Sequence, residues 1–351
     1  MFQTLARIGV RCSVVLPLAL GLAAQAQYNG PESVEYDPVG DRYFVSNTQS
    51  QTIKVRAQDA TVSTFVQVGA APYGLEILAD TLYACVGGRV KGYALADAAL
   101  VFDLDLGATF LNGITTDGTY LYCTDFSAGR ILKVDPTSAT FELLVPNTQG
   151  TPNGIVHRPG TEELLVAYWG ANAAVRSFDR TTGATIGQVN TSLTNIDGIT
   201  FDCLGRVLVA SWSPDRITAF DWGIISPVFI DLMVPGLNNP ADIDFDQVHG
   251  RVCIPNSGSN TVLLAEVDCS TGLFGIRTYV TRVLPNPTTG LVRFDPPMEH
   301  PEPYMVLDAR GCLQATGTLR AHATMDLAPL PDGLYTIVFS RRAQQVRVVK
   351  E

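Results

Sequence analysis

Histidine is scarce in this 351-residue chain, which has only His157, His249, His300 and His322, all far apart. So few imidazole groups leave little room for a histidine-rich zinc site or a two-metal hydrolase centre. The chain also lacks runs of basic residues, and its 24 lysines and arginines are outnumbered by 34 acidic residues. The resulting net charge of −10 repels phosphate backbones, so we expect no nucleic-acid partner.

Several familiar catalytic signatures are missing as well. The sequence has no GxSxG, P-loop, GxGxxG or HExxH motif. It therefore lacks the usual signatures of serine hydrolases, nucleotide hydrolases, dinucleotide enzymes and zincins. Cysteines never form a CxxC pair, and one disulfide of unspecified pairing remains open. After the first 26 residues no stretch holds 18 uncharged apolar residues, and we expect no transmembrane segment in the mature chain.

The N-terminus has the layout of a secretory signal peptide spanning residues 1–26. Arg7 and Arg11 form a positive start, and a mostly apolar stretch follows from Cys12 to Ala24. The small residues of Ala24-Gln25-Ala26 suit a cleavage site. The sequence therefore predicts an exported protein, in a compartment where disulfides are able to form.

The middle of the chain repeats one pattern six times. Each copy reads as an apolar strand, a DPxGD-like turn, a second strand, a polar turn and a third strand, followed by a more variable fourth strand. Aligned residues recur every 39 to 44 positions, at Ser33, Gly74, Gly113, Gly154, Gly198 and Asp242. Four short strands per repeat of this length are typical of propeller blades. We predict an all-β chain with a six-bladed β-propeller over 27–282, whose natural last outer strand is residues 274–280.

The repeat stops near Val283, and residues 283–351 form a different unit. The tail contains Pro285-Asn286-Pro287-Thr288-Thr289-Gly290, then a turn from Asp308 to Gly311, then Leu330-Pro331-Asp332-Gly333-Leu334-Tyr335. Alternating strands and Pro/Gly turns predict a small β-sandwich. These motifs resemble the type A C-terminal sorting domain of the type IX secretion system of Bacteroidetes. The resemblance implies the type IX machinery as a partner and a secreted or outer-surface location.

Inner strands of a propeller begin at one rim, so the residues that precede them converge around the central channel. In the six copies these residues are Glu32, Tyr73, Asn112, Asn153, Asp197 and Ala241. Carboxylate and amide oxygens suit a hard divalent cation, and the sequence predicts such a site in the channel. Trp169 and Trp212 end second strands at the same rim and offer a stacking wall for a ring-shaped or apolar ligand.

The same residues carry a family resemblance. Glu32 in PESVEYD, Asn153 in PNGI and Asp197 in IDGI resemble the three metal-ligand motifs of the senescence-marker-protein/gluconolactonase (regucalcin-like) family. The resemblance implies one divalent cation, Ca²⁺ in first place with Mg²⁺, Mn²⁺ or Zn²⁺ as alternatives, that polarises a lactone carbonyl. It makes Asp197 both a ligand and the catalytic general base, and it places Asn112 near the substrate.

One substrate-side position departs from that family. Its lactonases usually have an arginine two residues before the third-blade asparagine, where this chain has Phe110. A polar sugar acid therefore loses its cationic anchor here. The alternative function is a non-catalytic binding propeller for a glycan or protein ligand at the channel rim. A third hypothesis is a cell-surface structural module in which the metal only braces the channel.

Each ligand candidate also has a plain structural interpretation. Asn153-Gly154 and Asp197-Gly198 are able to serve as turn residues that favour the left-handed region, and Glu32 as a solvated turn acid. Trp169 and Trp212 are equally suited to packing. The functional hypothesis depends on all three oxygen-bearing residues occurring in the right copies of the repeat.

Overall fold

The computed structural model describes residues 27–269, 282–295, 302–309, 312–320, 324–339 and 344–351. The predicted signal peptide and the predicted outer strand at 274–280 lie outside these ranges. All regular secondary structure in these ranges is β, and they contain no helix long and apolar enough to cross a membrane. The chain divides into two compact units, residues 1–267 and 268–351.

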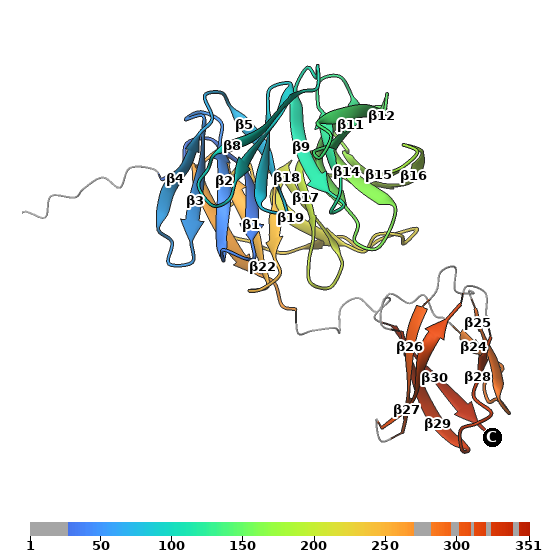
Figure 1. Cartoon of the computed structure of the whole chain (residues 1–351). Coiled ribbons are helices and arrows are strands. Elements are labelled where there is room, and N and C mark those ends of the chain that lie inside the picture. The colour runs from blue at the N-terminus through green and yellow to red at the C-terminus, as the bar shows by residue number, and fades with distance from the viewer. Residues whose placement is uncertain (1–26, 270–281, 296–301, 310–311, 321–323, 340–343) are drawn as a thin grey trace, which may run out of the picture. The chain divides into compact units, whose positions relative to one another are not determined.

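The first unit consists of consecutive antiparallel sheets, each made by one repeat of the sequence (Figure 1). The first two sheets contain β1 (Pro31–Asp37), β2 (Arg42–Asn47), β3 (Thr52–Ala57) and β4 (Val62–Gln67), then β5 (Pro72–Leu78), β6 (Thr81–Val86), β7 (Arg89–Ala94) and β8 (Leu100–Asp105). The next two contain β9 (Leu111–Thr116), β10 (Leu121–Asp125), β11 (Arg130–Asp135) and β12 (Thr140–Val145), then β13 (Thr151–His157), β14 (Glu163–Trp169), β15 (Ala174–Asp179) and β16 (Thr185–Asn190).

The fifth sheet contains β17 (Thr194–Phe201), β18 (Val207–Ser213), β19 (Asp215–Phe220) and β20 (Ile230–Asp231). Its fourth strand is much shorter than the VFIDL segment predicted, because only two of those residues pair with β19. The sixth sheet has three strands in the described residues, β21 (Asp244–Asp246), β22 (Arg251–Asn256) and β23 (Thr261–Glu266). Strands alternate with tight turns in every repeat, as the sequence pattern predicts.

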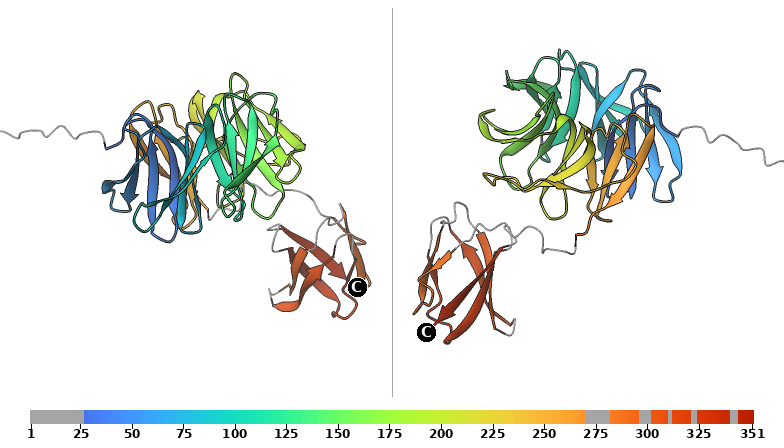
Figure 2. Two further views of the ribbon diagram at one scale, coloured as in Figure 1. Left: turned by 45° about the horizontal axis from the view of Figure 1, so that its top comes forward. Right: turned by 180° about the vertical axis from the view of Figure 1, so that it is seen from behind.

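The first strands of the six sheets contact one another in a closed circle. β1 contacts β5, and the contacts continue through β9, β13 and β17 to β21, which returns to β1. A parallel bridge between Ser33 and Asp242 joins the last sheet to the first. Figure 2 shows the sheets following one another around this unit in chain order. Apolar side chains of neighbouring sheets pack together and fill the spaces between the sheets, so both faces of each sheet are covered.

Small residues permit this close approach of the first strands. A Cβ atom added at Gly74 would lie 2.4 Å from the carbonyl oxygen of Asn112, and one at Gly113 or Gly154 would lie 2.6 Å from the carbonyl oxygen of the next strand. None of these three glycines has a positive φ angle. Asn153, Asp197 and Gly198 have no positive φ angle either, so the left-handed interpretation of Asn153-Gly154 and Asp197-Gly198 is wrong, because space and not backbone conformation requires each glycine.

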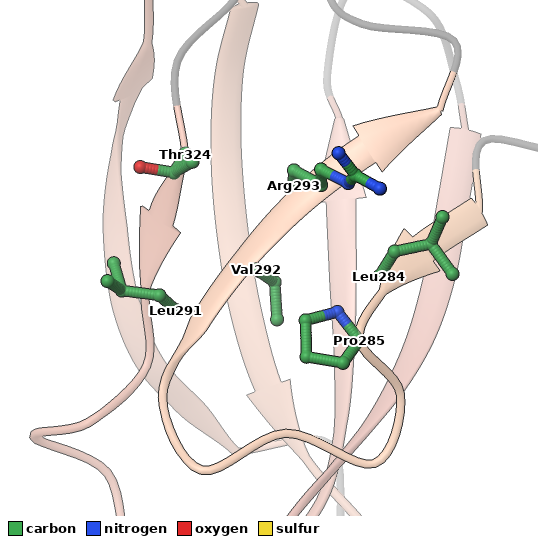
Figure 3. A pocket seen from close by; sticks show the side chains of 6 residues that line it. All are labelled: Leu284, Pro285, Leu291, Val292, Arg293 and Thr324. Carbon is green, nitrogen blue, oxygen red and sulfur yellow. The ribbon is translucent and has the colours of Figure 1, made fainter.

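The second unit has two antiparallel sheets around one apolar core. One contains β24 (Arg282–Leu284), β25 (Leu291–Asp295) and β28 (Met325–Asp326), and the other contains β26 (Glu302–Asp308), β27 (Leu313–Leu319), β29 (Gly333–Phe339) and β30 (Gln344–Lys350). Figure 3 shows a pocket beside β24 and β25, lined by Leu284, Pro285, Leu291, Val292, Arg293 and Thr324. It has no carboxylate or histidine, and therefore no obvious catalytic group.

We expect Gly74→Ala to destabilise the first unit by about 1–3 kcal/mol, because the new methyl group meets a backbone carbonyl that cannot move alone. Urea unfolding measures the effect. Gly187→Ala in β16 is the matched control, since its nearest atom would lie 3.4 Å away. Equal stability of the two variants would contradict this account of the ring.

Candidate functional site

A β-bulge at the same place in successive first strands presents the predicted site residues. The register shifts between Pro31 and Val34 in β1, and equivalent shifts occur in β5, β9, β13 and β17. In each bulge, two residues of the first strand lie opposite one residue of the second strand. The second of the two is a serine or glycine, and the first is Glu32, Tyr73, Asn112, Asn153 or Asp197. Bulges redirect side chains and are common beside active sites. The local fold thus turns five predicted residues toward the same end of the ring.

Asn153 and Asp197 meet directly across the gap between the fourth and fifth sheets. The Asn153 amide nitrogen donates a hydrogen bond to Asp197 Oδ1 at 3.1 Å, and both side chains are buried. Burial raises the pKa of Asp197 to about 7, although hydrogen bonds from Asn153 and Trp212 oppose the rise. Two of the three predicted ligands are therefore in contact, in a site that disfavours an uncompensated negative charge.

Glu32 belongs to the same electrostatic cluster. Burial and the nearby charges of Asp197 and Asp242 hold the pKa of Glu32 well above its usual range. Asp242 itself has a raised pKa, chiefly through burial, although Ser33 donates a hydrogen bond to it at 2.9 Å. The repeat pattern predicts Ala241 as the sixth inner residue and does not reveal Asp242. Asp242 aligns with Ser33 and with the glycines of the other copies, which bear no carboxylate.

Two oxygen atoms at this site are buried without a hydrogen-bond partner, namely Glu32 Oε2 and Asn153 Oδ1. The Asn153 amide is oriented by its bond to Asp197, which leaves the carbonyl oxygen free to accept. Buried acceptors of this kind normally have a partner, and oxygen donors with surplus negative charge suit a hard cation. The residues therefore fit a divalent cation. Within the described ranges no group of three or more His, Cys, Asp or Glu is arranged for a metal, so the fit depends on the asparagine amide.

The other rim residues divide into two kinds. Asn112 is buried in the bulge of the third sheet, next to the strand that carries Asn153. Asp125 accepts hydrogen bonds from the backbone of Thr109 and Phe110 and pairs with Arg130. Asn47 and Asn256 similarly bond to nearby backbone groups. These last three side chains therefore hold turns in place.

Aromatic residues line the same end of the ring in an unbroken row. Trp169 and Trp212 meet edge to face with ring centres 4.9 Å apart, and Phe126 lies 6.1 Å from Trp169. Phe110 continues the row at 5.5 Å from Phe126, and Tyr73 follows at 4.6 Å from Phe110. All five are half-buried. The two predicted tryptophans and Phe110 are thus joined, whereas Phe126 and Tyr73 were not foreseen as parts of one surface.

A second layer of acids lies further along the first strands. Glu35 Oε1 accepts a hydrogen bond from the Ile77 backbone at 3.1 Å, and Asp244 Oδ2 accepts one from the Tyr36 backbone at 2.9 Å. Glu76 bonds in the same way to the third sheet. Each acid thus ties its own sheet to the next one. Burial, with the charges of Glu76, Asp244 and Asp242, raises the pKa of Glu35 well above its usual range.

Because these acids bind protons more tightly in the folded chain, stability falls as the pH rises from about 4 through their raised pKa values. Glu35→Gln removes one charge and keeps the acceptor for Ile77. In chelator, we expect this variant to exceed the wild type in stability at pH 7.5 by about 1–3 kcal/mol, because a buried carboxylate charge no longer has to be removed from water.

At pH 4.5 the difference between the two proteins should shrink, which urea unfolding across the pH range measures. Glu266→Gln, on the exposed end of β23, is the control and should stay within about 0.5 kcal/mol at both pH values. A pH-independent gain for Glu35→Gln would contradict the electrostatic explanation.

Solved structures similar to this chain are β-propellers. A gluconolactonase from Xanthomonas campestris aligns with a TM-score of 0.57 and 16% identity, covering 68% of this chain and 86% of its own. A candidate gluconolactonase aligns at 0.54 and 17%, covering 68% and 91%. The β-propeller domain of Cps50 (Swd1) from Myceliophteria thermophila aligns at 0.51 and 11%, covering 68% and 98%.

No protein-family model and no curated protein matches the sequence. At these low identities the structural likenesses establish the fold, and the chain is an all-β protein with a β-propeller. These likenesses do not identify a reaction, which depends on the residues at the end of the ring.

Proposed function

We propose that the six sheets are the blades of a six-bladed propeller whose channel mouth binds one divalent cation, Ca²⁺ by preference, and hydrolyses a lactone or related ester. The observation that carries this proposal is the pair of unpartnered buried acceptors, Glu32 Oε2 and Asn153 Oδ1, beside the Asp197 carboxylate. The gluconolactonases among the structural neighbours support the same reaction class.

Glu32, Asn153 and Asp197 would hold the cation, which supplies Lewis-acid polarisation of the substrate carbonyl when bound. In the reaction, water oxygen adds to the lactone carbonyl carbon and the ring C–O bond breaks. One proton of the water passes to Asp197 and then to the departing alkoxide oxygen, which yields a hydroxy acid. Asn153 orients Asp197 through its hydrogen bond. Asn112, buried in the bulge of the next sheet, would face the substrate.

The test is calcium titration of the purified full chain after chelation. We expect one bound equivalent by calorimetry, a raised melting temperature, and lactone turnover that is lost in chelator and restored by Ca²⁺. Asp197→Asn should weaken Ca²⁺ binding about a hundredfold or more and abolish turnover, because it removes a charged ligand.

Asp80→Asn, on an exposed turn of the second sheet, is the matched control and should behave like the wild type. If the wild type binds no Ca²⁺, or Asp197→Asn binds it equally well, the metal site is wrong. If Ca²⁺ binds but turnover persists in chelator, the reaction does not use the metal.

A non-catalytic binding propeller is the second candidate function. The row of five half-buried aromatic rings favours it, because such a surface also suits a glycan or a protein segment. Calcium binding without turnover of any lactone would decide for this alternative.

We also propose that residues 1–26 direct export and that residues 283–351 are a type IX sorting domain. The proline- and glycine-rich motifs and the separate compact unit at the C-terminal end support this. In a bacterium with a type IX system, the full chain should reach the medium or the outer surface. A chain ending at residue 282 should stay inside the outer membrane, and its export would overturn the assignment.

A further inference from the structure

The row of aromatic rings begins and ends at the proposed cation site. At one end Tyr73 lies beside Glu32, and its pKa is raised by burial and then by the charge of that carboxylate. At the other end Trp212 lies close enough to Asp197 to oppose the rise of its pKa, and the indole N–H donates a hydrogen bond to the backbone oxygen of Pro240 at 3.1 Å. Substrate that reaches the site therefore passes beside this row.

The row is continuous across four sheets. Tyr73 is in β5, Phe110 directly precedes β9, Phe126 directly follows β10, and Trp169 and Trp212 lie at the ends of β14 and β18. Consecutive rings pack edge to face at 4.6 to 6.1 Å, so each ring is held by its neighbours. Because they are only half-buried, they form a fixed, preformed apolar wall for a ligand.

The charges at the site also favour an uncharged, apolar ligand. The charged groups that act on Glu32 and Asp242 are other carboxylates. A divalent cation offsets two negative charges among three carboxylates, which leaves no positive charge to attract an anion. Arg130, at this end of the third sheet, is already paired with Asp125. An uncharged ligand therefore fits better than an acid or a phosphate.

We infer that the substrate is an uncharged lactone or ester with an aromatic or alicyclic body that lies along the row from Tyr73 to Trp212. This rests on the proposed hydrolase function and names its substrate class. A polyhydroxylated sugar lactone fits less well than an apolar one, because a single sugar ring enclosed between this wall and the cation site would bury hydroxyl groups without hydrogen-bond partners, whereas a glycan lying over the wall keeps its hydroxyl groups in water.

The experiment compares dihydrocoumarin with glucono-1,5-lactone as substrates of the calcium-loaded full chain, and uses dihydroquinolin-2-one as an unreactive analogue of the first. We expect kcat/KM for dihydrocoumarin to be at least about tenfold higher. Trp169→Ala should raise its KM, and the Kd of the analogue, about tenfold while Ca²⁺ binding is unchanged, and Trp169→Phe should recover most of the loss.

Trp222→Phe is the matched control, since Trp222 is buried in the fifth sheet and bonds to Glu163 away from the row. Preference for the sugar lactone, or unchanged binding in Trp169→Ala, would overturn the inference and leave the hydrolase intact. If neither lactone is hydrolysed but the analogue binds and Trp169→Ala weakens it, the ligand class stands and the hydrolase fails. If the analogue does not bind and neither lactone is hydrolysed, both are wrong.

Discussion

The first strands of the six sheets lie so close together that almost everything else in the first unit follows from their spacing. At Gly74, Gly113 and Gly154, the carbonyl oxygen of the next strand occupies the position where a side chain would begin. The residue before each glycine lies in the bulge at the start of its strand, at equivalent positions in successive sheets. One packing constraint thus sets both the closed circle and the placement of the site residues.

Electrostatics at the centre of the ring is the second consequence of that spacing. Two layers of carboxylates are brought together, with Glu32, Asp197 and Asp242 in one and Glu35, Glu76 and Asp244 in the other. The second layer is occupied with backbone N–H groups, so its role is structural. The first layer retains a free acceptor on Glu32, next to that of Asn153, which distinguishes a ligand-binding cluster from a merely acidic one.

The sequence predicts the repeats, their strands and the convergence of Glu32, Asn153 and Asp197, because each depends on local pattern and regular spacing. It did not reveal Asp242, since a repeat alignment treats one position alike in every copy. It also could not show that Phe126 joins Trp169 to Phe110, because ring contacts depend on side-chain directions that no periodicity encodes. For the same reason the sequence does not show that the Asp125 carboxylate bonds to the neighbouring turn.

The hydrogen bonds between neighbouring sheets have a consequence for the chain ends. Asp244 of the last sheet holds the Tyr36 backbone of the first in the same way that Glu35 holds Ile77 of the second. The junction between the last sheet and the first is therefore chemically like a junction between sheets that follow one another in the chain. The propeller has no privileged seam, and a circular permutant that opens at another turn keeps every one of these bonds.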